Sequence, residues 1–260
     1  MDKELTRKGL AHPKSIRVWQ GFRSTVLAAD WQRFSEQLGK IFIPATVQQM
    51  QPLSLQAYFP LILSDSGFAL PDELALVVYP TQEAYTVATK ETVAGRAYGA
   101  LHSTVFNFNR DGPIPRSRSY FPTAWSGSFE DNQPVYLIDR EIDWHSGVMR
   151  CLVIKSREPA GIILQYERIA AIVNNWLDSA SGDVDNVIIQ AEAGYLMCWE
   201  HYVQASEEGV TGALMTQVQG VVVIDTWAEK VLVKPLFSLA DTGVEPTAGL
   251  LMDVRLDVES

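Results

Sequence analysis

The sequence predicts an α+β protein made of two halves, each with the element order βαββαβ. Three observations carry this prediction. Apolar residues recur at steps of three and four in some segments, which is the period of a helix, and runs of β-forming residues lie between turn-rich segments. The same order of patterns then occurs a second time along the chain. A length of 260 residues is enough for two halves that each bury a core.

In the first half, strands are expected at 15–24, 53–63, 73–79 and 103–109. A first helix lies between the first two strands, and Pro44 is expected to kink or break it. A second helix is expected from Thr81, whose hydroxyl can cap it, and to run into the last strand. The apolar face of the first helix consists of Leu27, Trp31, Phe34, Leu38 and Ile41.

The second half repeats this order. We expect a strand at 147–156, a helix at 157–179 and a long strand or hairpin arm at 186–204. A strand at 219–225 and a helix from Thr226 follow. The segments 134–139 and 249–259 are expected to be strands as well.

Residues 111–134 join the two halves without a periodic pattern. A connection of this length is usually a linker or a functional cover, and its four aromatic residues favour packing over one half. We therefore divide the chain into a tail (1–14), a first half (15–110), a linker or cover (111–134) and a second half (135–260).

Composition excludes several classes of function. A net charge of −10 without a basic stripe disfavours nucleic acid as a partner. No apolar run is long enough to span a membrane, and the start of the chain lacks the apolar stretch of a signal peptide. Cys151 and Cys198 form no disulfide framework. We therefore expect a cytoplasmic protein with no membrane partner.

Two βαββαβ units in one chain resemble the tandem ferredoxin-like fold and the dimeric α+β barrel superfamily. The stretch "GRAYGALH" (95–102), at the end of the expected helix, is similar to members of that superfamily. The resemblance implies two sheets that face each other as an intrachain barrel around a pocket. The superfamily contains cofactor-free monooxygenases, lyases and isomerases as well as haem enzymes, so the resemblance does not select one function.

Alternation along the strands predicts which residues face that pocket. In the first strand we assign Ile16 and Val18 to the helices, and Arg17 and Trp19 to the barrel interior. Glu192 lies on the mixed, charged side of a later strand and receives the same assignment. The alternative is that the mixed sides face solvent, as antiparallel sheets often allow.

Three further groups were weighed for chemistry. Arg96, Tyr98 and His102 follow a helical pattern, and we assign them a structural role. Asp143 and His145 lie two residues apart on an extended chain, so the carboxylate could orient the imidazole as a general base. Cysteine and histidine in "CWEH" (198–201) point to opposite sides of a strand, which disfavours a metal site.

These patterns predict a protein that binds a small, largely apolar organic ligand, in the manner of a cofactor-independent oxygenase, lyase or isomerase. No cofactor and no metal are expected, and a homodimer stays open. The alternative is a non-catalytic interaction or scaffold protein. The predicted catalytic residues are His145 and Glu192, and the predicted ligand-binding residues are Arg17, Trp19, Arg23, Asn107 and Arg255.

Overall fold

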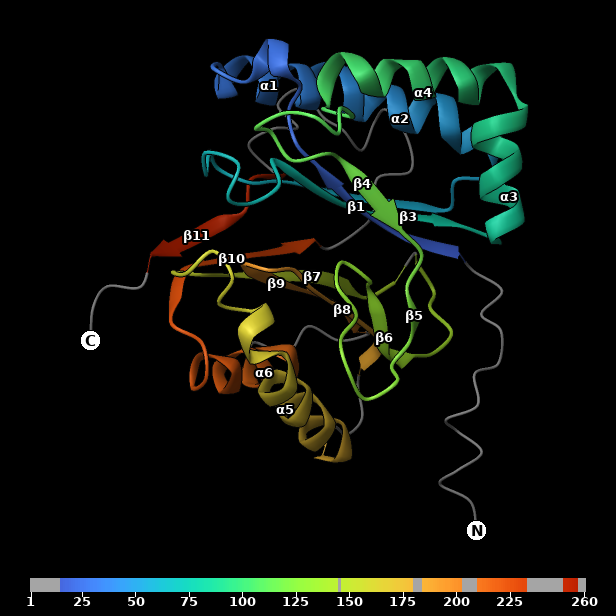
Figure 1. Ribbon diagram of the computed structural model, residues 1–260. Helices are drawn as coiled ribbons and strands as arrows, with labels where there is room; N and C mark the ends of the chain where they lie inside the picture. The colour runs from blue at the N-terminus through green and yellow to red at the C-terminus, as the bar shows by residue number, and fades with distance from the viewer. Residues whose placement is uncertain (1–14, 145, 180–183, 203–209, 233–249, 257–260) are drawn as a thin grey trace.

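The computed structural model describes residues 15–144, 146–179, 184–202, 210–232 and 250–256. Two β-sheets lie face to face, with one group of helices outside the first sheet and a second group outside the other (Figure 1). The prediction of an α+β protein is confirmed. Within the described residues, no helix has the length and apolar character needed to cross a membrane.

The first sheet is antiparallel and has the order β2-β3-β1-β4. Its central strands β1 and β3 pair along their whole lengths, from Ser15 with Tyr79 to Gly21 with Glu73. Three of the predicted strands form here. The bounds are β1 (Ser15–Gly21), β2 (Ala57–Ile62), β3 (Glu73–Tyr79) and β4 (Arg118–Tyr120).

The helices on this sheet are α1 (Trp31–Gln37), η2 (Leu38–Phe42), α2 (Ile43–Met50), α3 (Gln82–Thr86), η4 (Val87–Glu91) and α4 (Val93–Val105). The predicted break at Pro44 is wrong, because the chain stays helical from Trp31 to Met50. The π-helical turn η2 precedes Pro44, which then occupies the first turn of α2, where a missing N–H is tolerated. Two short 3₁₀ turns, η1 (Thr25–Leu27) and η3 (Gln51–Leu53), flank this run.

The predicted N-cap Thr81 accepts a hydrogen bond from the Ala84 N–H. The helix that it starts is interrupted, because Thr92 leaves the helical conformation and caps α4 through the Gly95 N–H. The predicted strand at 103–109 is wrong. Since α4 continues to Val105, only Phe106 makes a β-bridge, and the edge position beside β1 is taken by β4.

The second sheet has the order β11-β10-β7-β9-β8-β6-β5, and α5 and α6 cover its outer face (Figure 1). The predicted long strand at 186–204 is a hairpin of β8 and β9. The bounds are β5 (Thr123–Ala124), β6 (Val135–Asp139), β7 (Val148–Ser156), η5 (Ile163–Gln165), α5 (Tyr166–Ser179), β8 (Val184–Ala191), β9 (Tyr195–Tyr202), α6 (Val210–Gln219), β10 (Ile224–Leu232) and β11 (Asp253–Leu256).

Two predictions near the end of the chain are wrong. Of the expected strand at 219–225, Gln219 ends the helix α6, residues 220–223 form neither helix nor strand, and only Ile224 and Asp225 are extended. The expected helix from Thr226 is the continuation of that strand, β10. Because β10 pairs with β7 from Ile224 to Leu232, tertiary pairing overrides the local likeness to the helix that begins at Thr81.

An apolar core fills the space between the sheets, with Ile16 and Val18 of β1 packed in one cluster with Cys151 of β7 and Trp199 of β9. The face assignment of β1 is therefore wrong. The side with Ile16, Val18 and Gln20 faces the second sheet, and the mixed side, with Trp19, faces the helices. A charged barrel interior would leave ionised groups in a dry space, and the mixed side instead meets the wetter space under the helices.

Candidate functional site

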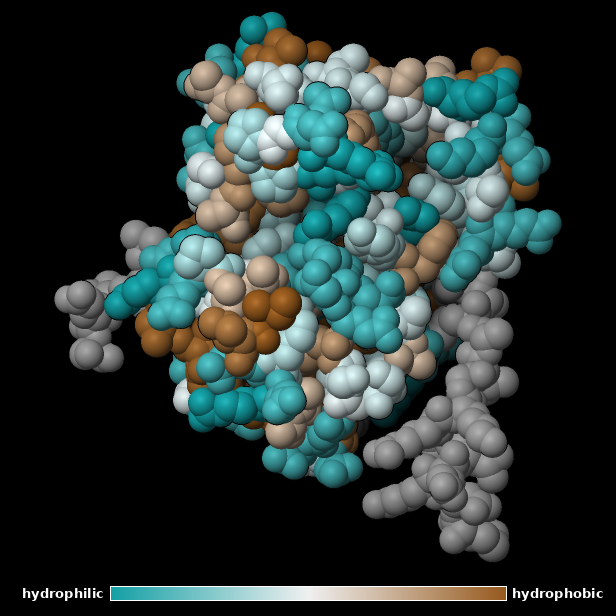
Figure 2. Space-filling model, viewed as in Figure 1, coloured by the Kyte–Doolittle hydropathy of each residue, from teal (hydrophilic) through white to brown (hydrophobic). Residues whose placement is uncertain are grey.

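A cavity of about 500 Å³ lies between the first sheet and the helices α2, α3 and α4, and residues 116–120 border its opening. Strands β1, β2 and β3 form its floor. Hydrophilic side chains gather across the middle of the surface where β4 lies (Figures 1 and 2). The inner part of the cavity is thus formed by elements of the apolar core, and its rim is polar.

The floor contains a fully buried carboxyl group, that of Glu73. The Trp19 indole N–H donates to Glu73 Oε2 at 2.6 Å, and the Tyr58 hydroxyl donates to Oε1 at 3.0 Å. Two hydrogen bonds do not offset the loss of water, so burial raises the pKa of Glu73 to about 8. The carboxyl group is therefore largely protonated at pH 7.

Aromatic rings form the wall on the α2 and α4 side. The His102 ring lies edge-on to Phe42, Tyr98 and Trp19, with centroids 4.8, 4.4 and 5.6 Å apart. Burial lowers the pKa of His102 to about 4, so the imidazole is neutral near pH 7. Its Nδ1 lies 2.9 Å from the Tyr98 carbonyl, and since a carbonyl only accepts, Nδ1 carries the proton and Nε2 is an acceptor.

Arg17 occupies the rim between two aromatic rings, with its guanidinium carbon 4.5 Å from the Tyr85 ring centroid and 4.4 Å from that of Phe121. Its Nε donates to the Ser119 hydroxyl, and its Nη2 donates to the Ser119 carbonyl at 2.9 Å. Burial lowers the pKa of Arg17. Stacking and neutral hydrogen bonds hold this cation in place, and neither neutralises it.

Two glycines of α4 border the cavity for different reasons. A Cβ at Gly95 would lie 1.8 Å from the Ala88 carbonyl oxygen, so only glycine lets α4 approach η4 this closely. A Cβ at Gly99 would have no atom within 4 Å. Position 99 is therefore open space at the edge of the cavity.

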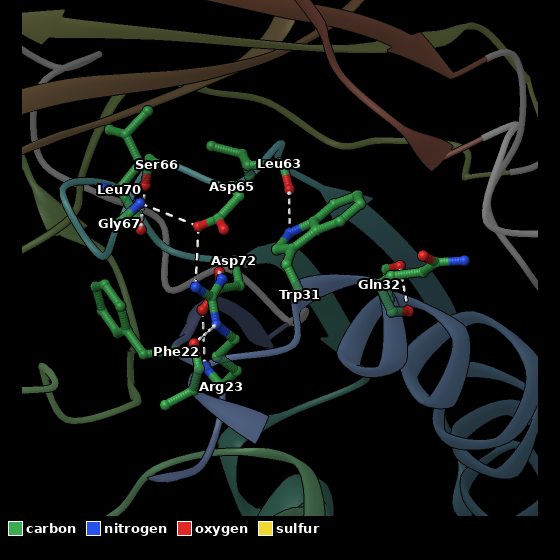
Figure 3. A network of polar contacts seen from close by, with 12 residues as sticks. Phe22, Arg23, Trp31, Gln32, Leu63, Asp65, Ser66, Gly67, Leu70 and Asp72 are labelled. Carbon is green, nitrogen blue, oxygen red and sulfur yellow. Dashed lines mark hydrogen bonds and ion pairs between the residues drawn. The ribbon is translucent and has the colours of Figure 1, made fainter. Parts of the chain in front are cut away.

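The structure places two of the predicted ligand-binding residues, Arg17 and Trp19, at this cavity. Arg23 lies elsewhere. Its guanidinium is buried and pairs with Asp72 at 2.5 Å and Asp65 at 2.9 Å, beside the loop at 63–70 (Figure 3). With both carboxylates bound to it, Arg23 holds the end of β1 to that loop and does not meet Arg17.

The remaining predicted residues are also apart from the cavity. Asn107 is buried and donates to the carbonyls of Ile114 and Pro115. Glu192 lies between the sheets, where Gln20 and Gln190 donate to its Oε1 at 3.0 and 2.8 Å. The predicted barrel places Arg17, Glu192 and Arg255 around one cavity. In the structure, Arg17 lines the cavity and Glu192 does not.

His145 and the side chain of Arg255 lie outside the described residues, although the backbone of Arg255 pairs with Trp227 in the second sheet. Of the trio assigned a structural role, Tyr98 and His102 line the cavity, whereas Arg96 donates to the carbonyls of Lys90 and Glu91 on the helix exterior.

Glu73 and Tyr58 were missed by the sequence reasoning. Glu73 stands first in the apolar run "ELALVVY" (73–79) and lies on the same strand face as Ala75 and Val77. A charged residue on an otherwise apolar face could have indicated a functional residue. Tyr58 belongs to an entirely buried strand, and nothing in its neighbours distinguishes it from an ordinary core residue.

No family model and no curated protein matches the chain. Among solved structures, a putative monooxygenase from Fusobacterium nucleatum subsp. nucleatum is 10% identical, with 84% of this chain and 89% of that chain covered and a TM-score of 0.38. A putative monooxygenase from Lactobacillus acidophilus is 8% identical (84% and 91% covered, TM-score 0.35). An anthrone oxidase-like protein is 9% identical (84% and 88% covered, TM-score 0.32). TM-scores this low carry neither fold nor activity over to this chain.

Proposed function

We propose that this protein binds a small, largely apolar organic molecule in the cavity between the first sheet and its helices. The observation that carries this proposal is the cavity itself, with a volume of about 500 Å³, an aromatic wall and a few converging polar groups. Ligand pockets in proteins have volumes of about 300 to 1,000 Å³ and this kind of lining.

The proposal includes the finer fold assignment, two ferredoxin-like units packed as an intrachain α+β barrel. The order β2-β3-β1-β4 of the first sheet recurs in the second as β8-β9-β7-β10. In each set, counted along the chain, a helix follows the first strand and another follows the third. The apolar cluster between the sheets supports the face-to-face arrangement. In this assignment the ligand binds within the first unit rather than between the two.

The chemistry that the cavity favours is transfer of a proton. Glu73 changes its protonation state near neutral pH and lies on the cavity floor, as a general acid or base must. Trp19 and Tyr58 hold its two oxygens in place. Removal of a proton from a bound organic molecule is a step that fits cofactor-independent oxygenases, lyases and isomerases, the classes expected from the sequence.

If the protein were a non-catalytic interaction protein, we would expect the aromatic residues of the linker to be exposed. Most of these residues are packed instead. Phe121 lies against Arg17 and Tyr85. Trp125 and Phe129 pack against each other, with centroids 4.9 Å apart, and join the core of the second sheet. The linker aromatics therefore support a closed ligand site more than a docking patch.

Titration with N-phenyl-1-naphthylamine, a neutral apolar dye whose fluorescence rises in apolar surroundings, tests the proposal. Wild type is expected to bind one dye molecule with saturation. Gly99→Phe places a ring in the open space at the cavity and is expected to weaken binding by about tenfold or more. Ala100→Phe adds the same ring one position later, on an exposed part of α4 that does not line the cavity, and serves as the control.

Both variants need an unchanged circular dichroism spectrum for the comparison to hold. Dye binding that is absent from wild type, or that is equal in wild type and Gly99→Phe, contradicts the proposal. Native mass spectrometry of freshly purified wild type, compared with Gly99→Phe, then identifies any retained molecule by a mass that the blocked variant lacks.

A further inference from the structure

We infer that the ligand of this cavity is an aromatic organic anion, a carboxylate or sulfonate, whose negative group binds Arg17 at the rim. This inference rests on the proposed function and names the class of molecule that the site takes. It follows from the sign of the charges that line the cavity, which is opposite to the sign of the net charge of the chain.

Arg17 carries a charge that nothing in the described part of the chain neutralises. Its Nε and Nη2 donate to Ser119, and its Nη1 has no hydrogen bond to a described residue. No described carboxylate lies within 4 Å of it, whereas Arg23, Arg118 and Arg150 each have such a partner. Arg17 is thus an arginine held in place by several contacts and prepared for a partner from outside the described part of the protein.

The partial burial of Arg17 makes an anion favourable there. Loss of water is the main cause that lowers the pKa of Arg17, and the nearby Tyr85 offsets it only in part. A partly desolvated cation gains more from a negative partner than an exposed cation does, because the surrounding dielectric constant is lower. Sandwiched between the Tyr85 and Phe121 rings, the guanidinium also loses little freedom on binding.

Two further cations, Lys90 and Arg116, line the same cavity without a described carboxylate within 4 Å. Arg118 lines it as well, but Glu192 neutralises that charge. Among the described residues of the lining, only Glu73 has a carboxyl group, and it is largely protonated at pH 7 because burial raises its pKa to about 8. The described lining is therefore positive, although the chain carries a net charge of −10.

The other end of the cavity sets the shape of the ligand. Its wall consists of aromatic rings in edge-to-face contact, including Phe42 and Tyr98 with His102, and the Tyr98 hydroxyl is hydrogen-bonded to that of Thr46. A molecule with an aromatic body and a negative group at its edge fits both ends.

Two dyes that differ by a single sulfonate test this inference. 1-Anilinonaphthalene-8-sulfonate is the anionic counterpart of the neutral N-phenyl-1-naphthylamine, so their difference in affinity measures recognition of the charge. At low ionic strength we expect wild type to bind the sulfonate about tenfold more tightly than the neutral dye, the gain typical of a charge-assisted hydrogen bond. The preference is expected to shrink as salt is added.

Arg17→Met keeps an unbranched apolar side chain in place of the arginine stem and removes the charged guanidinium. It is expected to weaken sulfonate binding by about tenfold and to change binding of the neutral dye by less than about twofold. Arg168→Met, on the exposed face of α5 in the other helical layer, is the control and is expected to change neither affinity. If Arg17→Met does not fold, the double variant Lys90→Met/Arg116→Met decides, because both of these side chains are exposed.

The outcomes separate the two proposals. Equal affinity for the two dyes, with binding of the neutral dye still blocked by Gly99→Phe, overturns the anion inference and leaves the proposed function standing. Failure of wild type to bind either dye overturns both. Sulfonate binding that survives Gly99→Phe takes place outside the cavity and also counts against the inference.

Discussion

Replacing Glu73 by glutamine is expected to abolish a pH dependence of stability that this buried carboxyl group imposes on the wild-type protein. The pKa of Glu73 is about 8 in the folded chain, against 4.5 for an unperturbed glutamate. Between these pH values the folded protein holds a proton that the unfolded chain has released. The stabilisation is therefore fully present below pH 4.5 and is lost as the pH rises through 8.

The size of the effect follows from the two pKa values. The free energy of unfolding of wild type is expected to fall by about 1.4 kcal/mol per pH unit in the middle of this range. From pH 6 to pH 8 the loss amounts to about 2 kcal/mol, because the titration levels off near the folded pKa. Asp72, whose pKa burial raises to about 6, contributes mainly below this window.

Glutamine is a close substitute for the protonated carboxyl group. Its amide oxygen can accept from the Trp19 N–H, and its amide nitrogen can donate to the Tyr58 hydroxyl oxygen. Urea unfolding of both proteins at pH 6, 7 and 8 measures the difference. We expect similar stability at pH 6 and an advantage of about 2 kcal/mol for Glu73→Gln at pH 8. Parallel pH profiles for the two proteins would refute the reasoning.

Three other experiments test the packing of the protein. Gly95→Ala is expected to cost about 2 kcal/mol or more in urea unfolding, since its Cβ meets a backbone carbonyl, whereas Gly99→Ala in open space is expected to gain up to about 1 kcal/mol; equal effects would contradict the helix contact. Arg23→Met leaves Asp72 buried without its cation and is expected to lower the free energy of unfolding by about 3 kcal/mol or more. A change below about 1 kcal/mol would show that the pair is not desolvated. Both cysteines are buried with raised pKa values, so neither should react with Ellman's reagent before unfolding; a reaction in native buffer at neutral pH would disprove their burial.

Much of the secondary structure could be predicted, because local patterns report which residues share a face. Helical spacing located the helical run that starts at Trp31 and the helix α5, and β-forming runs located β1, β3, β6 and β7. The errors lie where a local pattern fits two structures. The segment from Thr226 begins like a helix, and its pairing with β7 decides for a strand.

The candidate site was predicted in part. Arg17 and Trp19 were singled out because they share the mixed side of a strand, and they do line the cavity, though for a reason opposite to the one expected. Arg23 and Asn107 show the limit of this reasoning. A polar residue that binds the protein's own carboxylates or carbonyls has the same local pattern as one that awaits a ligand.

The sequence by itself determined the α+β class and the alternation that puts Arg17 and Trp19 on one side of β1 and Ile16 and Val18 on the other. Only the tertiary structure decided which layer covers each side. Alternation is a property of one strand, whereas the cover comes from elements far away in the chain, and those bury the side with Ile16 and Val18 between the sheets. The raised pKa of Glu73 arises in the same way, from the layers packed around its carboxyl group.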